Sequence, residues 1–312
     1  MADTVLAGPV ADAGPAASGG PGAAPGPAPG TPPATARPPR APERPILQAV
    51  GIGLILLAVF VLGLAGYLYG LSRVQEARAQ TILYTQLQHE LANQVAPLGP
   101  TAPGSPVAVL DIPAIGIRDM VVVQGTSPEN LTLGPGHLRG TPMPGQAGVS
   151  EIFGRRATFG APFARLADLR PGDVIVTITG QGRSVYRVAA LGGSQEVRIV
   201  DPEPNRLLLV TASSPVVPSY YVEVDARLVS VTRPGPPVVR VLNAPELALA
   251  GDDGALVLTF IWGVALAVVS AVGTYAALRW SLWAAYLAAV PLAIAVLWLL
   301  YQSLSMLLPN VY

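Results

Sequence analysis

The sequence predicts a mostly β domain, a barrel or a sandwich, that is held to a membrane by three helices. Between residues 107 and 231, runs rich in β-branched residues are separated by turn residues, which is the pattern of strands. Three uncharged stretches, residues 46–71, 255–278 and 281–301, are long enough to cross a bilayer, which takes about 20 residues. Only 12% of the residues are charged and 51% are hydrophobic, a balance that is typical of membrane proteins.

Residues 1–44 consist mainly of Ala, Pro and Gly, and we expect a disordered cytoplasmic segment. A plain spacer is the simpler interpretation, with a Pro-rich docking site as the alternative. Residues 46–71 are predicted to be an uncleaved signal-anchor, because the stretch is too long and too far from the N-terminus for a cleaved signal peptide. The preceding Arg37, Arg40 and Arg44 favour a cytoplasmic N-terminus.

Residues 72–96 are predicted to continue as an amphipathic stalk helix. Apolar side chains recur at steps of three, four or seven, at Val74, Ala77, Tyr84, Leu87, Leu91 and Val95. We expect this stripe to pack on the folded domain. A dimerising coiled coil is the alternative, although the repeat is short for one.

Residues 97–232 form the predicted β domain, which has the size of a usual single domain. Its strand candidates are VAVLDIP, MVVVQG, VSEIFG, DVIVTITG, SVYRVAAL, RLLLVTA and YYVEVDARLVSV. Gly180, Gln181 and Gly182 indicate a hairpin between two of them. Short helices are expected near residues 127–129 and from 162 to 169.

Residues 233–254 are a predicted linker, and the two spans that follow must form an antiparallel hairpin because so few residues join them around Arg279. The positive-inside rule puts Arg279 in the cytoplasm, and the β domain and the C-terminus outside. No ionisable residue lies inside any span, which argues against a proton relay or an ion transporter. Small residues allow close helix packing, either for simple anchoring or for docking to another membrane protein, and they are Gly263, Ala265, Ala267, Ser270 and Gly273.

The composition excludes several kinds of site. Cysteine is absent, so the chain has no disulfide, thiolate metal site or thiol nucleophile. Histidine occurs only as His89 and His137, which rules out a zinc site with several His ligands. We expect no metal and no cofactor. The net charge is zero, so nothing indicates a nucleic-acid partner.

Several segments, taken in order, resemble a sortase domain, most nearly of the class E type. They are LDIPAIGI (110–117), the Gly125-Thr126 pair, LGPGHLRGTPMPGQAG (133–148), FGRRATFGAPFARLADLRPGD (153–173), LLVTA (208–212) and a terminal strand that ends in ARL. The resemblance covers about residues 72–231, including the stalk. It implies an eight-stranded β-barrel and a groove for an extended peptide.

The resemblance also implies a chemistry that this chain lacks. Sortases are cysteine transpeptidases that cut a sorting signal of the Leu-Pro-x-Thr-Gly kind with a Cys, a His and an Arg. The matching positions hold Ala212, Arg155 and Tyr221, of which the third match is the least specific. Alanine has no nucleophilic atom, guanidinium cannot accept a proton, and tyrosine brings no positive charge. We therefore expect a fold that is kept without its catalysis.

Two alternatives keep an enzymatic role. Ser213 and Ser214 follow Ala212 and could act as a non-cysteine nucleophile, but either would need a base, and His137 lies outside the segment that matches the catalytic histidine. Their simpler interpretation is the start of a turn before Pro215. The other alternative is a helper of an active sortase.

The predicted function is therefore non-catalytic binding or scaffolding of a membrane or cell-envelope protein or peptide. The candidate ligand residues in the groove are Arg155, Arg156, Thr211, Tyr221 and His137. Arginine is suited to a carboxylate or phosphate, which it binds with two hydrogen bonds. The alternative is that Arg155 pairs with a neighbouring acid or points to solvent.

Overall fold

The computed structural model describes residues 45–194, 205–214, 220–237, 246–247, 250–252, 254–279 and 282–312. The chain divides into two compact units, Met1–Gly51 and Ile52–Tyr312, and all strands belong to the second. The predicted disorder of residues 1–44 and most of the predicted linker lie outside the described residues.

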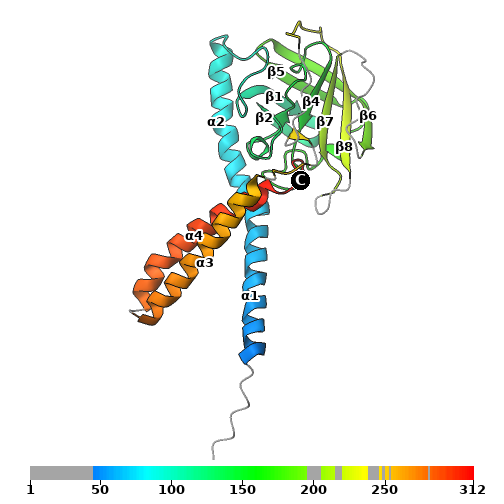
Figure 1. Ribbon diagram of the computed structural model, residues 1–312. Helices are drawn as coiled ribbons and strands as arrows, with labels where there is room; N and C mark the ends of the chain where they lie inside the picture. The colour runs from blue at the N-terminus through cyan, green and yellow to red at the C-terminus, as the bar shows by residue number, and fades with distance from the viewer. Residues whose placement is uncertain are drawn as a thin grey trace, which may run out of the picture. The chain divides into compact units, whose positions relative to one another are not determined.

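The β domain is a closed eight-stranded barrel, so the barrel that the resemblance implied is confirmed (Figure 1). Around the barrel the strand order is β1-β2-β3-β4-β7-β8-β6-β5. The strands are β1 (Pro106–Ile112), β2 (Ile117–Gln124), β3 (Gly136–His137), β4 (Val149–Phe153), β5 (Val174–Thr179), β6 (Gly182–Ser194), β7 (Arg206–Ala212) and β8 (Tyr221–Leu228). The β2–β3 and β4–β7 pairs are parallel.

Local sequence signals explain several of the connections between the strands of the barrel. The expected hairpin joins β5 and β6, with Thr179 opposite Gly182, and Gly182 has the positive φ of +104° that glycine tolerates. The two expected short helices are single 3₁₀ turns, η3 (Asn130–Thr132) and η4 (Leu166–Asp168), and a third turn, η2 (Pro113–Ile115), follows β1. β3 has only two residues, too few for an alternating pattern to show.

Alternation along each strand separates an inner from an outer face. In β7, Leu207 and Leu209 belong to the apolar cluster that fills the barrel. Leu208, Val210 and Ala212 belong to a second apolar cluster instead. The end of β7 therefore presents Ala212 on the outer face of the barrel, away from the interior core.

Helix α1 (Pro45–Gly66) continues through the π-helical turn η1 (Tyr67–Leu71) into α2 (Ser72–Ala92), which packs along β1 and β2 (Figure 1). The expected apolar stripe is wrong in part, because Val74, Ala77 and Val95 are exposed. The reason is that polar side chains share the buried face of α2 with apolar ones. That face contains Ser72, Glu76, Gln80, Leu83, Leu87 and Leu91.

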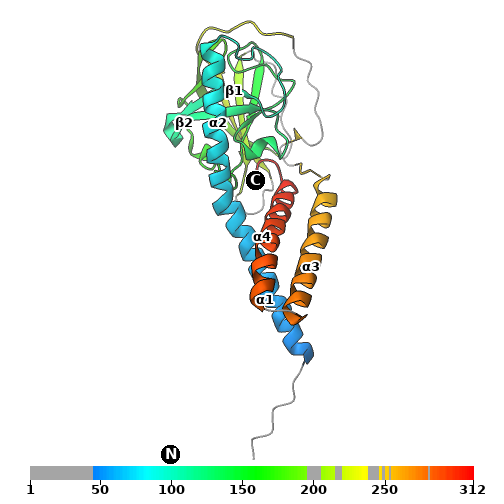
Figure 2. The ribbon, with the colours of Figure 1, turned by 90° about the vertical axis from the view of Figure 1, so that its left-hand side faces the viewer.

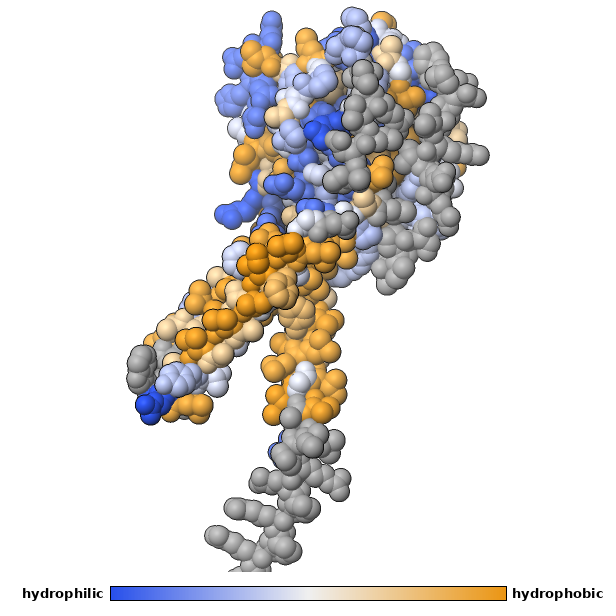
Figure 3. Space-filling model, viewed as in Figure 1, coloured by the Kyte–Doolittle hydropathy of each residue, from blue (hydrophilic) through white to orange (hydrophobic). Residues whose placement is uncertain are grey.

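Helices α3 (Ala255–Arg279) and α4 (Leu282–Met306) lie side by side as an antiparallel hairpin (Figures 1 and 2). The Asp252 N–H donates a hydrogen bond to the Met306 carbonyl (3.0 Å), which joins the start of one helix to the end of the other. Among the described residues, three helices are long and apolar enough to cross a membrane by length and composition, and apolar side chains make up most of the visible surface of the α3–α4 hairpin (Figure 3). Pro291 lies within α4, which continues through it.

Candidate functional site

The loop that follows β4 lies beside the end of β7. The two strands run parallel, with Phe153 opposite Val210. The Gly154 N–H donates to the Val210 carbonyl (3.0 Å), and the buried Thr211 hydroxyl donates to the Gly154 carbonyl (2.9 Å). Thr211 is thus used to fix the loop, and the residues that follow Gly154 are held next to the end of β7.

Three sequence-predicted residues meet at this point. β7 and β8 are antiparallel, with Ala212 directly opposite Tyr221. Arg156 reaches across from the loop, and its guanidinium donates to the Ala212 carbonyl (3.0 Å). Arg155 precedes it in the same loop. The structure therefore pairs Ala212 with Tyr221, the positions at which the resemblance implies Cys and Arg, whereas the Arg155 side chain at the His position contacts other residues.

Arg155 is fully buried, an unusual environment for a guanidinium. Its Nη1 donates to Thr158 Oγ1 (3.3 Å), its Nη2 donates to the Pro128 carbonyl (3.1 Å), and its Cζ lies 4.8 Å from the centre of the Phe159 ring. Burial lowers the pKa of Arg155 to about 10, so the group stays protonated at neutral pH. No ion pair in the described part of the chain includes Arg155, and the side chain does not point to solvent.

The surface around Ala212 and Tyr221 is apolar and covered. Ala212 is fully buried and Tyr221 is nearly so, although both lie on the outer face of the barrel. The apolar cluster on this face contains Leu131, Leu138, Phe153, Leu208, Val210, Ala212, Tyr221 and Val311. An alanine methyl group among such neighbours can pack against an apolar side chain, but it cannot attack a carbonyl carbon.

His137 lies on β3 and takes part in a separate hydrogen-bond network. Its Nε2 lies 2.9 Å from the Pro142 carbonyl oxygen and 3.1 Å from Thr141 Oγ1, and its Nδ1 lies 3.3 Å from Gln124 Oε1. Burial lowers the pKa of His137 to about 4, and the hydrogen bond with Pro142 opposes that shift. The imidazole is therefore neutral at pH 7 and braces β2 and the loop after β3.

Ser213 closes the end of the β7–β8 ladder. Its N–H donates to the Tyr220 carbonyl (2.9 Å), and its Oγ accepts a hydrogen bond from the Tyr220 N–H (3.3 Å). These are the contacts of a residue at the start of a turn, the simpler of the two interpretations of this serine. The hydrogen bonds described for the His137 ring go to other residues, so the imidazole does not act as a base for Ser213.

A segment from the far end of the sequence completes the site. Val311 is fully buried in the cluster that contains Ala212 and Tyr221. The Arg156 N–H donates to the Val311 carbonyl (3.1 Å), and the N–H groups of Ala157 and Thr158 both donate to the Tyr312 backbone oxygen (3.2 and 3.4 Å). Sequence reasoning missed this contact. The local sequence gives one indication of a change here, Pro309, which ends the apolar run. Pro309 does not predict which part of the protein residues 310–312 contact.

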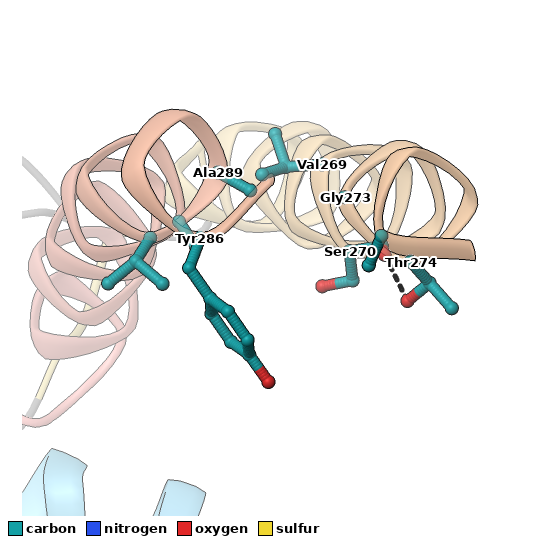
Figure 4. A pocket seen from close by; sticks show the side chains of 9 residues that line it. Val269, Ser270, Gly273, Thr274, Tyr286 and Ala289 are labelled. Atoms are coloured by element: carbon teal, nitrogen blue, oxygen red, sulfur yellow. Dashed lines mark hydrogen bonds between the residues drawn. The ribbon is translucent and has the colours of Figure 1, made fainter. Parts of the chain in front are cut away.

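A cavity of about 350 Å³ lies between α3 and α4 (Figure 4). Its labelled lining residues are Val269, Ser270, Gly273, Thr274, Tyr286 and Ala289. A Cβ atom added at Gly273 would lie only 2.9 Å from the Ala289 Cβ, so glycine is what allows the two helices to approach here. The lining contains no carboxylate, imidazole or guanidinium. Elsewhere in the described residues, no group of three or more His, Asp or Glu side chains could hold a metal ion.

Known proteins with similar sequences were found in two comparisons. A family model for the sortase domain matches residues 110–234. Among curated proteins, Sortase SrtE1 of Streptomyces coelicolor is 28% identical over 201 residues, which make up 58% of this chain and 57% of that protein. The chain therefore matches little more than half the length of this relative.

Solved sortase structures are also similar to the chain. Sortase E from Streptomyces avermitilis is 31% identical, covers 42% of this chain and 91% of its own, and has a TM-score of 0.38. A Clostridium perfringens sortase D5 transpeptidase is 20% identical, covers 49% of this chain and 99% of its own, and has a TM-score of 0.44. Residues 110–234, which hold most of the closed eight-stranded barrel, therefore match a sortase domain.

Proposed function

We propose that this protein is a non-catalytic member of the sortase family that binds a protein or peptide of the cell envelope. One observation carries the proposal: the methyl group of Ala212 stands at the end of β7, where the resemblance implies the nucleophilic thiol. Arg155, at the histidine position, has no lone pair to accept a proton. Tyr221, at the arginine position, carries no positive charge at neutral pH.

The proposed binding site is the outer face of the barrel at the ends of β7 and β8. Its candidate ligand residues are Arg155, Arg156, Thr211 and Tyr221, whereas His137 belongs to the separate network around β3. Arg155 is the main candidate for an anionic group, because burial without an acidic partner leaves a cation whose field is poorly screened. Arg156 already holds a backbone carbonyl, which is the contact that an incoming peptide would make.

The proposed location is the outer side of the cell membrane. Residues 46–71 act as a signal-anchor with a cytoplasmic N-terminus, and the sortase domain faces the exterior. The hydrogen bonds between residues 156–158 and residues 311–312 support this arrangement, because they put the end of the chain on the same side of the membrane as the barrel. Arg279, at the other end of the α3–α4 hairpin, then faces the cytoplasm, in agreement with the positive-inside rule.

Crosslinking followed by affinity purification from native membranes tests the binding role. Arg155→Met keeps most of the side-chain volume and removes the charge, and Arg170→Ala removes an exposed arginine of the same domain as the matched control. We expect a partner that is recovered with the wild type and with Arg170→Ala, and lost with Arg155→Met. Equal recovery of the partner with all three proteins would mean that the partner binds to the membrane helices or to another face of the domain, and not at Arg155.

A direct assay tests the absence of catalysis. The purified wild type should neither cleave nor transfer a Leu-Pro-x-Thr-Gly peptide, and it should not react with a fluorophosphonate probe. Peptide cleavage by the wild type would overturn the non-catalytic role. Fluorophosphonate labelling that disappears in Ser213→Ala or Ser214→Ala would overturn it in favour of a serine nucleophile.

A further inference from the structure

We propose that residues 308–312 are a built-in ligand of the sortase-domain site, and that a short apolar peptide can bind there only when this segment leaves. This inference rests on the proposed binding function. It adds the chemical class of the ligand and the way in which access is controlled. Both views of the ribbon place the end of the chain against the barrel (Figures 1 and 2).

Backbone hydrogen bonds hold the segment. Three successive N–H groups, those of Arg156, Ala157 and Thr158, donate to the carbonyl of Val311 and the backbone oxygen of Tyr312. The Thr158 hydroxyl donates to the same Tyr312 oxygen (3.2 Å). These hydrogen bonds involve the backbone atoms of the segment and not its side chains. The peptide groups of another chain could therefore replace those of the segment.

An apolar contact supplies side-chain selectivity. The Val311 side chain is fully buried against the cluster that contains Ala212 and Tyr221. Burying a valine side chain removes apolar surface from water and so favours the bound position of the segment. A charged side chain in the same apolar cluster would lose its hydration, which opposes its binding there. The ligand class is therefore a short peptide with a small branched apolar residue at this position.

Arg155 is coupled to the segment through one side chain. Its Nη1 donates to Thr158 Oγ1, and Thr158 Oγ1 donates to the Tyr312 backbone oxygen. The buried guanidinium thus polarises the hydroxyl that faces the ligand. This relay lets the arginine at the former histidine position act on the backbone of a bound segment through Thr158.

Contacts outside the barrel connect the segment to the linker and the membrane helices. Asn310 is buried, its N–H donates to the Ala250 carbonyl (2.9 Å), and its Nδ2 donates to the Leu247 carbonyl (2.7 Å). The hydroxyl groups of Tyr312 and Tyr69 lie 2.7 Å apart. Because α4 runs directly into the segment, a movement of the α3–α4 hairpin in the membrane would draw Val311 out of the site.

Thiol labelling tests whether the segment covers the site. The chain has no cysteine, so a single Ala157→Cys substitution gives one thiol beside Tyr312. The full-length protein in detergent micelles is reacted with a maleimide in two backgrounds, Val311→Asp and Val231→Asp, the second at an exposed valine. We expect Val311→Asp to raise the labelling rate roughly tenfold or more, and Val231→Asp to leave it unchanged.

Two controls distinguish opening of the segment from unfolding of the barrel. A thiol at the exposed Ala114 should react equally fast in both backgrounds, and circular dichroism should show the same barrel content. A labelling rate at position 157 that is already fast in the wild type, or that does not respond to Val311→Asp, would overturn the inference. The partner test with Arg155→Met can still succeed in that case, so the inference and the proposed function fail separately.

Peptide binding tests the ligand class. The probe is a synthetic peptide with the sequence of residues 307–312, Leu-Leu-Pro-Asn-Val-Tyr, that carries a fluorophore at its N-terminus. It should bind the full-length Val311→Asp protein at least roughly tenfold more tightly than the wild type, because the tethered segment no longer competes. A matched peptide with Asp in place of Val should not bind. Equal affinity for the wild type and the variant, or equal affinity of the two peptides, would overturn the proposal.

Discussion

The interior of the barrel and its outer face at Ala212 are both buried, but they are built from different parts of the chain. The buried residues described for the interior cluster run from Val107 to Ala226, so they all come from the barrel domain. The outer cluster is completed by Val311, which follows α4. The interior can therefore form whenever the strands pair, whereas the outer face also depends on where α3 and α4 place residues 308–312.

This difference implies two levels of stability. A contact that one short segment makes with a preformed face can open without unfolding the face, because local opening requires less free energy than global unfolding. The barrel would then persist while the site is uncovered. The following substitutions test this separation, starting with the largest expected effect.

A substitution in the interior should destabilise the whole barrel. Leu209 is fully buried in the interior cluster, and Leu209→Ala should lower the free energy of unfolding by about 2–5 kcal/mol. Thermal or denaturant unfolding followed by circular dichroism measures this loss, with Val231→Ala at an exposed position as the control. If Leu209→Ala only speeds labelling at position 157 and leaves the free energy of unfolding unchanged, then the stability of the interior is not independent of the opening of the outer face.

A pH titration of stability should detect His137. The pKa of His137 in the folded state is about 4, below the usual 6.5. As the pH falls, His137 of the unfolded chain is therefore protonated at a higher pH than His137 of the folded chain. The stability due to the neutral ring is fully present above pH 6.5 and is lost as the pH falls to about 4, with a limit on the order of 3 kcal/mol. His137→Gln cannot titrate there, so the wild type should lose more stability than the variant over this range. Parallel curves for the two proteins would contradict the burial of a neutral imidazole.

The sequence could predict the parts of the fold that depend on local pattern. Alternation in LLLVTA puts Leu207 and Leu209 on one face and Ala212 on the other, and the Gly180–Gly182 turn is a local hairpin signal. Uncharged length alone predicts the membrane spans. The ordered segments of the resemblance also predict Ala212 and Tyr221 as neighbours, and the two residues pair across β7 and β8.

Contacts that depend on tertiary packing could not be predicted from the sequence. Val311 is one apolar residue after a proline, and no period connects it to β7. The face of α2 was predicted wrongly for a related reason. Gln80, a polar residue, is fixed there by hydrogen bonds to the backbone of Val121 (3.0 Å and 2.8 Å), so burial follows hydrogen bonding as well as hydropathy.

Packing between α1 and α4 should influence the outer face but not the interior. Gly63 lies where a Cβ atom would overlap the Tyr301 hydroxyl, whereas Gly66 has nothing within 4 Å. Gly63→Ala should therefore displace α4 and destabilise this contact by about 1–3 kcal/mol, which should speed labelling at position 157. Gly66→Ala is the matched control and should not. Equal labelling in the two variants would show that the α1–α4 contact does not control the site.

The smallest expected effect belongs to a single hydroxyl group. Tyr312 and Tyr69 share a hydrogen bond of 2.7 Å, and burial is the main cause that raises the pKa of Tyr312 to about 12. Tyr312→Phe keeps the ring and removes this bond, so the covered state should lose about 0.5–1.5 kcal/mol. Labelling at position 157 should then rise by a factor of roughly two to ten, with Tyr275→Phe on an exposed face of α3 as the control. A rise as large as that from Val311→Asp would mean that the hydroxyl pair, and not the apolar contact, holds the segment in the site.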